Sequence, residues 1–237
     1  GRHRERCFDP DRVAALLGNA PVIASEGRAF PVGTRYVPPD PLQRLEDQVT
    51  AATLAALRAD QGSILVFLPG QGEIARTAER LQGRVPADTD IAPLYGQLTA
   101  AEQDRAIAPA PTGRRKIVLA TSIAETSLTI EGIRIVVDSG FRRVPAYDPA
   151  TGLSTLETRR VSRAAAEQRR GRAGRTARGI AYRLWNEGQT GGLEPFDAPE
   201  ILAADLSNLV LDLASWGVTD PGKLSFLDPP PKPAWAE

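Results

Sequence analysis

The chain has 237 residues, of which 42% are hydrophobic, and its formal net charge at pH 7 is zero. This length suffices for one full domain with a sizeable core, or for one domain and part of another. There is no signal-peptide pattern and no apolar run of the ~18 residues that suggest a membrane span.

A single cysteine, Cys7, excludes an internal disulfide, and with the one histidine, His3, it argues against a zinc site. We therefore expect a globular, cytoplasmic protein with no membrane partner and no metal-ligating residues. The chain contains no methionine and so does not begin at a natural start codon. This favours a piece of a longer protein.

The charges are unevenly distributed along the chain. Ten arginines and three acidic residues give 142–178 a local charge of +7, and nine acidic residues and two lysines give 186–237 a local charge of −7. A basic segment in a neutral protein is typical of a phosphate-facing surface. On charge alone, a solvated arginine-rich face is an equal alternative.

The predicted elements begin with irregular residues 1–32, apart from a short helix after Asp9. TRYVPP then predicts a strand stopped by two prolines, and Pro41 precedes an amphipathic helix over 42–59. QGEIARTAERLQG predicts a helix, and so does TAAEQDRAI, with a capping box between Thr99 and Glu102. Short apolar strands are predicted at 63–70, 91–96, 115–122, 133–140 and 178–185.

Strands that alternate with helices in this way predict an α/β fold, a doubly wound parallel sheet with helices on both faces. A projecting β-hairpin is expected at 142–156, with Pro149, Thr151 and Gly152 in its turn. A strongly apolar helix is expected from 199 to a glycine at 217. The predicted domains are a lead-in at 1–32, the α/β domain at 33–188, and the start of a C-terminal helical region at 189–237.

An arginine- and glycine-rich stretch, AAAEQRRGRAGRTARG, occupies 164–179. Ser162 can cap a helix running through Arg175, which places Gln168, Arg172 and Arg175 on one face and Arg169 off it. Planar guanidinium groups bind phosphate oxygens in a bidentate manner, so this face suits a polyphosphate. The glycines 171 and 174 let a ligand or another backbone approach closely. The alternative is an arginine-rich helix paired with surface acids.

A hydroxyl-rich stretch, LATSIAETSLTI, follows the strand at 115–122. Ligands bind at the carboxyl ends of strands in open α/β sheets. Hydroxyls and backbone N–H groups there suit a sugar-phosphate backbone without base specificity; the alternative is a polar loop that caps itself. The candidate contacts are Thr121, Ser122, Thr126 and Ser127.

One sequence, GVTDPGKL at 217–224, has the spacing of a phosphate-binding P-loop. Leu224 replaces the Mg²⁺-binding hydroxyl residue, Pro221 interrupts the loop, and a helix rather than a strand precedes it. We therefore expect a helix end and a turn there.

Six ordered motifs carry a family resemblance over nearly the whole chain from Asp9. They are ILVFLPGQGEI, LYGQL, ATSIAETSLTIEGI, VVDSG, YDPATGLSTL and EQRRGRAGR. They resemble motifs IV, V, Va and VI of the second RecA-like domain of DEAH/RHA-type superfamily 2 helicases. The lead-in and the tail FLDPPP make the chain most similar to the bacterial HrpB-like members, and the tail is expected to begin a winged-helix-like region.

The resemblance implies roles for individual residues. Gln168 and two arginine fingers, Arg172 and Arg175, would meet the γ-phosphate of ATP. Thr121 and Ser122 would contact the RNA backbone, although Ser122 stands where asparagine is commoner in the family. Glu131 would meet the ribose in place of the usual aspartate. Ile107 lies where many relatives have an aromatic residue, so base stacking is expected to be weak. The hairpin, with Arg142 and Arg143, would separate strands.

The resemblance also implies that ATP and Mg²⁺ are held mainly by a first RecA-like domain, whose Walker A and B motifs this chain lacks. The expected function is one half of the ATP site of an ATP-dependent RNA helicase, inactive alone, with single-stranded RNA or another nucleic acid as partner. One alternative is a stand-alone nucleic-acid-binding or regulatory module without ATPase activity. A weaker alternative is an autonomous P-loop enzyme that uses Lys223.

Overall fold

The structure, a computed structural model, describes residues 10–23, 30–125, 130–148 and 153–231. The chain forms two compact units. The larger comprises Gly27–Arg142 and Thr158–Phe196, and the smaller comprises Gly1–Glu26, Arg143–Glu157 and Asp197–Glu237.

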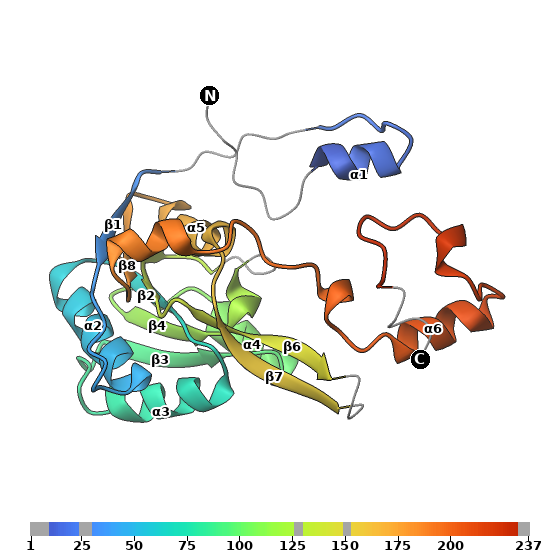
Figure 1. Ribbon diagram of the computed structural model, residues 1–237. Helices are drawn as coiled ribbons and strands as arrows, with labels where there is room; N and C mark the ends of the chain where they lie inside the picture. The colour runs from blue at the N-terminus through green and yellow to red at the C-terminus, as the bar shows by residue number, and fades with distance from the viewer. Residues whose placement is uncertain (1–9, 24–29, 126–129, 149–152, 232–237) are drawn as a thin grey trace. The chain divides into compact units, whose positions relative to one another are not determined.

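The larger unit is built on a six-stranded sheet in the order β1-β8-β5-β2-β4-β3. All of these strands except β5 are labelled in Figure 1. All neighbouring strands are parallel, which confirms the predicted doubly wound sheet. At its centre Val66 of β2 pairs with Leu119 of β4 on one side and Val137 of β5 on the other. The strands are β1 (Val32–Tyr36), β2 (Ser63–Phe67), β3 (Thr89–Leu94), β4 (Arg115–Ala120), β5 (Ile133–Asp138) and β8 (Gly179–Arg183).

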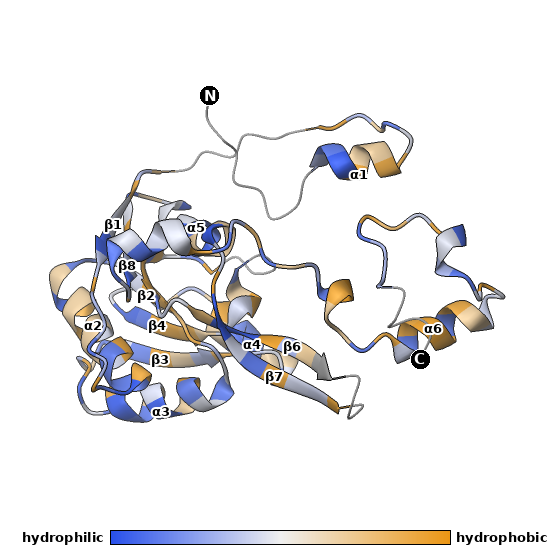
Figure 2. Ribbon diagram, in the orientation of Figure 1, coloured by the Kyte–Doolittle hydropathy of each residue, from blue (hydrophilic) through white to orange (hydrophobic). Residues whose placement is uncertain are grey.

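Helices cover both faces of this sheet, as predicted. Residues of α2 (Leu45–Ala59) and α3 (Gln71–Leu81) form one core with alternate strand residues such as Ile64 and Ile117. The other strand residues, including Leu65 and Val118, pack with α4 (Ala100–Ile107) and the short 3₁₀ helices η1 (Ser122–Ala124) and η2 (Arg172–Gly174). The central strands are buried on both faces, and most of their residues are hydrophobic, with Arg115 and Lys116 at the start of β4 among the exceptions (Figure 2).

The predicted N-termini of α4 and α2 can be compared with the structure. The capping box of α4 is confirmed, because Thr99 N–H donates to Glu102 Oε2 at 2.9 Å and Glu102 N–H donates to Thr99 Oγ1 at 3.4 Å. The start of α2 is three residues later than predicted. Asp40 accepts hydrogen bonds from the Leu42 amide and the Gln43 side chain, both at 2.9 Å. These bonds hold a turn ahead of the helix.

The predicted hairpin is present as the two-stranded sheet of β6 (Phe141–Asp148) and β7 (Leu153–Arg160). Its predicted turn residues 149–152 lie outside the described residues. The base of the hairpin belongs to the larger unit and residues 143–157 to the smaller one. After β8, residues Glu187–Gly192 form the 3₁₀ helix η3.

The apolar helix predicted over 199–217 is shorter and interrupted. Residues Glu200–Leu202 form the 3₁₀ helix η4, and α6 spans only Ser207–Ser215. The break has a local cause: Asp205 Oδ1 accepts from the Ser207 amide at 2.9 Å and from its hydroxyl at 2.6 Å, which forms a turn ahead of α6. The predicted end is confirmed, because Gly217 has a φ of 78° and the Val218 amide donates to Leu213 O at 2.8 Å.

The rest of the smaller unit contains α1 (Pro10–Leu16) and the 3₁₀ helix η5 (Pro221–Lys223). Arg12 of α1 donates to Asp228 Oδ1 at 2.8 Å and to Leu227 O at 2.6 Å. The P-loop-like sequence is a helix end and a turn, as expected, with Asp220 accepting from the Gly222 amide at 2.9 Å. Among the described residues, no helix combines the length and the hydrophobicity needed to cross a membrane.

Candidate functional site

The arginine-rich stretch begins with a capped helix, α5 (Arg163–Gly171). Ser162 Oγ accepts from the Ala165 amide at 3.1 Å, which confirms the predicted cap. The prediction of one α-helix through Arg175 is wrong, because α5 tightens at Arg172 into η2. The amide of Arg172 is shared between the carbonyls of Arg169 and Arg170, which is common where a helix tightens at its end.

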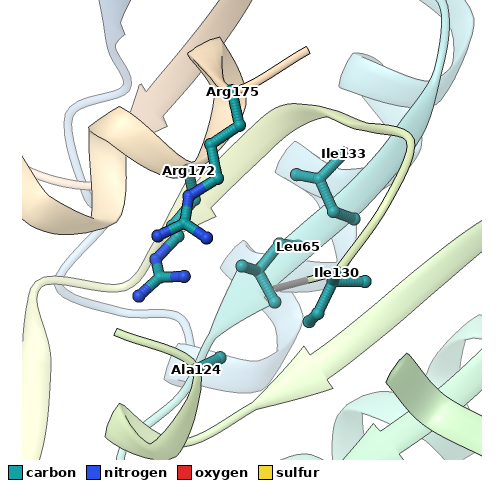
Figure 3. A pocket seen from close by; sticks show the side chains of 6 residues that line it. All are labelled: Leu65, Ala124, Ile130, Ile133, Arg172 and Arg175. Carbon is teal, nitrogen blue, oxygen red and sulfur yellow. The ribbon is translucent and has the colours of Figure 1, made fainter. Parts of the chain in front are cut away.

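Arg172 and Arg175 line the same small cavity (Figure 3). The rest of its lining is apolar and comes from β2, the loop after β4, and the start of β5: Leu65, Ala124, Ile130 and Ile133. The two guanidinium groups lie next to each other on one side of the cavity. The structure therefore brings together two of the three residues predicted to face a polyphosphate.

The two guanidinium groups repel each other electrostatically. Arg172 is only 5% exposed, and burial together with repulsion from Arg175 lowers the pKa of Arg172 to about 10, although Glu125 opposes the shift. Arg175 is exposed. A phosphate between the forks would offset both the burial and the repulsion, so this pair suits a multiply charged anion.

Gln168 is half-buried and is not among the residues that line the cavity. Its side-chain oxygen, Oε1, is buried and accepts no hydrogen bond from the described part of the protein. A buried acceptor without a partner is costly, so Gln168 retains the capacity to accept from a ligand or a water.

Arg169, predicted to lie off the face of Arg172 and Arg175, points into the protein. Its side chain is fully buried and forms ion pairs at 2.7 Å with both Glu125 and Asp138. Ala165 and Ala166, at the i−4 and i−3 positions, are buried too, so Arg169 lies on the inward-facing stripe of α5. Burial raises the pKa of the Glu125 carboxyl even though Arg169 acts to lower it.

The two glycines of the stretch differ in their surroundings. A Cβ at Gly174 would lie 2.6 Å from the carbonyl oxygen of Phe30 and 2.6 Å from Val32 Cγ2, so this glycine admits another backbone. A Cβ at Gly171 would meet nothing within 4 Å. Of the two, only Gly171 leaves space for a ligand.

The predicted nucleic-acid contacts occupy two places in the larger unit and one in the hairpin. Thr121 and Ser122 are half-buried at the carboxyl end of β4, where Thr121 precedes η1. Arg142 is half-buried at the base of the hairpin, and Arg143 is exposed beyond it. The remaining two predicted contacts, Thr126 and Ser127, lie outside the described residues.

Two further predicted positions lie near the cavity or the core. Glu131 is exposed in the turn before β5, between the cavity residues Ile130 and Ile133. Ile107 packs against the core at the end of α4, where it offers no aromatic surface.

Residues 44–177 match the family described as helicase conserved C-terminal domain. The chain is 52% identical over 224 residues to the ATP-dependent RNA helicase HrpB of Escherichia coli (strain K12), covering 94% of this chain and 28% of that protein. It is 38% identical over 231 residues to the probable ATP-dependent RNA helicase DHX34 of Homo sapiens, covering 92% of this chain and 20% of that protein.

A crystal structure of the Escherichia coli DEAH/RHA helicase HrpB matches with a TM-score of 0.90 and 50% sequence identity, over 97% of this chain and 30% of that one. This likeness confirms the predicted RecA-like fold. The chain spans less than a third of the length of these relatives. The domain boundaries and the winged-helix-like nature of the C-terminal region stay predictions.

Proposed function

Because this chain belongs to the family of helicase conserved C-terminal domains, we propose that it supplies one half of the ATP site of an ATP-dependent RNA helicase. The single observation that carries the proposal is the cavity shared by Arg172 and Arg175. Two adjacent forks of fixed geometry match the terminal phosphate of a nucleotide better than they match a surface carboxylate.

In this proposal Arg172 and Arg175 bind the γ-phosphate oxygens and stabilise the charge that develops during phosphoryl transfer to water. Gln168 would meet the γ-phosphate with its side-chain amide, as the family motif implies. Glu131 meets the ribose. The cavity is lined by cations and apolar groups, which suit phosphate and do not suit a metal ion. Mg²⁺ neutralises phosphate charge when bound, and we assign its ligands to another RecA-like domain.

We assign binding of single-stranded RNA to the hydroxyl-rich loop and, as a separate contact, to the arginines at the start of the hairpin. Thr121 and Ser122 lie at the carboxyl end of β4, where ligands bind in open α/β sheets. With Thr126 and Ser127 they would bind the sugar-phosphate backbone. Arg142 and Arg143 would contact phosphates at the start of the hairpin.

The test is ATP hydrolysis by the full-length protein that contains this chain, with and without single-stranded RNA. We expect RNA-stimulated turnover that Arg172→Ala abolishes. A full-length protein that binds RNA but does not hydrolyse ATP would overturn the helicase assignment. That result would favour a nucleic-acid-binding or regulatory module, which the basic segment 142–178 also supports.

A further inference from the structure

Arg169 connects three segments of the larger unit through one buried guanidinium group. Nη1 donates to Asp138 Oδ1 at 2.7 Å, at the end of β5, and to the carbonyl of Phe141 at 3.2 Å, where the hairpin begins. Nε donates to Glu125 Oε1 at 2.8 Å, in the loop after β4. The group also lies 4.7 Å from the centre of the Phe67 ring. A single side chain thus fixes α5 to the loop, the sheet and the hairpin base.

The same residue is joined directly to the candidate phosphate-binding group. The carbonyl of Arg169 accepts a hydrogen bond from the amide of Arg172, the residue at which α5 becomes η2. Glu125 is electrostatically coupled to Arg169, to Arg172 and to Arg142 at the hairpin base. A displacement of Arg172 along the helix would therefore move Arg169, and through Arg169 it would reach the hairpin base at Phe141.

Stability alone does not explain this buried cluster. Buried ion pairs contribute little net stability compared with apolar residues of similar volume, because desolvation offsets their attraction. Within the described residues, Asp138 Oδ2 is also buried without a hydrogen-bond partner, which adds to the cost. The buried guanidinium group of Arg169 is better explained by its effect on geometry, because it holds the loop after β4, the end of β5 and the hairpin base in fixed positions.

We propose that Arg169, held by Glu125 and Asp138, is a positioning residue that couples the phosphate-facing Arg172 to the base of the hairpin. It touches neither nucleotide nor RNA, and it acts through Arg172 on one side and through Phe141 on the other. The functional consequence of this inference, strand separation driven by ATP, rests on the proposed helicase function. The mechanical link itself does not depend on that function.

The test uses Glu125→Gln and Asp138→Asn, which keep the shape of each side chain and remove one charge. Glu167→Gln is the matched control. Glu167 pairs with Arg170 of α5 and with Arg183 of β8, both at 2.5 Å, and so holds the same helix through a different strand. In the full-length helicase we measure RNA-stimulated ATP turnover and the duplex separated per ATP hydrolysed. The folding of every variant is checked by thermal unfolding.

For Glu125→Gln and Asp138→Asn we expect ATP turnover within about threefold of the unsubstituted protein and strand separation per ATP reduced by about tenfold. Glu167→Gln should leave that ratio unchanged. Arg169→Lys keeps the charge but loses the planar guanidinium group, so it should behave like Glu125→Gln. If Asp138→Asn does not fold, Arg169→Lys replaces it in the comparison with Glu167→Gln. Parallel loss of both activities in folded variants, or an unchanged ratio, would overturn the proposal.

A second measurement separates this proposal from the helicase assignment. Hydrogen–deuterium exchange on the chain alone, without ATP or RNA, reports the amides at the hairpin base, such as Val161, which donates to Gly140 O at 3.0 Å. Glu125→Gln should accelerate exchange there by about fivefold or more, and Glu167→Gln should not. Equal exchange in both variants would refute the link, even if the full-length protein proves to be a helicase.

Discussion

Gly174 and Phe30 form a direct backbone contact, in which the Phe30 amide donates to Gly174 O at 2.8 Å. The contact joins the residues that lead into β1 to the segment that contains Arg172 and Arg175. Because a Cβ at Gly174 would lie 2.6 Å from Phe30 O, the glycine is required by packing.

Gly174→Ala should therefore destabilise the chain by about 1–3 kcal/mol, the usual cost of overpacking. Gly171→Ala is the matched variant: it has open space and replaces glycine at the end of a helix, so its stability should be equal or up to about 1 kcal/mol higher. Urea unfolding of both variants checks this. A Gly171→Ala variant that is stable but inactive in the full-length protein would place the ligand at Gly171.

Arg172→Ala or Arg175→Ala should lower the kcat of the full-length helicase by roughly 10³–10⁵ with little effect on ATP affinity, because the forks stabilise charge that develops in the transition state. Arg→Lys at either position should not restore turnover, since a point charge cannot form two parallel hydrogen bonds. Steady-state kinetics measure both.

Arg163→Ala is the control for these variants. Arg163 is exposed at the start of α5, and we expect its substitution to leave kcat near normal. Arg169 cannot serve as the control, because its removal would leave two buried carboxylates unpaired. Near-normal turnover in Arg172→Lys and Arg175→Lys would show that the phosphate-binding residues are wrongly assigned.

The ion pair between Glu46 of α2 and Arg76 of α3, at 2.5 Å, should make stability depend on pH. Burial acts to raise the pKa of Glu46, but a backbone hydrogen bond and Arg76 outweigh it, so the pKa lies below its ordinary value of 4.5. A lowered pKa stabilises the folded state above pH 4.5, and this contribution is lost as the pH falls through the folded-state pKa.

Glu46→Gln should accordingly unfold at lower urea concentration than the unsubstituted chain at pH 7, by about 1 kcal/mol. The difference should shrink as the pH is lowered below 4.5. Glu79→Gln, at an exposed position of α3, should show neither effect. A Glu46→Gln deficit that stays constant with pH would mean that packing rather than charge holds α2 to α3.

The isolated chain should bind single-stranded RNA weakly, without sequence preference, and should not hydrolyse ATP. The proposed contacts are hydroxyls, backbone groups and hairpin arginines, none of which is arranged to read base edges. The logarithm of the binding constant should fall with the logarithm of salt concentration by about 0.7 per phosphate neutralised. Fluorescence anisotropy over a salt series measures the slope, and salt-insensitive binding of one short sequence would contradict it.

The local rules of the sequence predict most of the fold. Apolar runs such as 63–67 can be satisfied only in a sheet covered on both faces, and Thr99 with Glu102 marks a helix start without tertiary information. The helix predicted over 199–217 is too long, because apolar residues continue at helical spacing on both sides of Asp205. In the structure the Asp205 side chain forms a turn with Ser207 ahead of α6.

The candidate site is less predictable than the fold. Arg172 and Arg175 line one cavity, but Gln168, which was predicted to lie on the same helical face, does not line it. The burial of Arg169 was not predicted, because a charged residue on a helix is ordinarily exposed. Its burial depends on Asp138 and Glu125, which are 31 and 44 positions away in the sequence. No pattern within one helix contains that information.

Strand order also has a consequence for synthesis on the ribosome. Among the strands of the described residues, β1 pairs with β8 alone, and its partners lie 147 positions later, as for Val32 and Gly179. The block β5-β2-β4-β3 needs no later strand and can assemble first. At about 5–20 residues per second, β1 then remains an unpaired edge for roughly 7–30 seconds. Until β8 is synthesised, β1 therefore lacks its partner strand, and an unpaired strand edge is prone to pair with other chains.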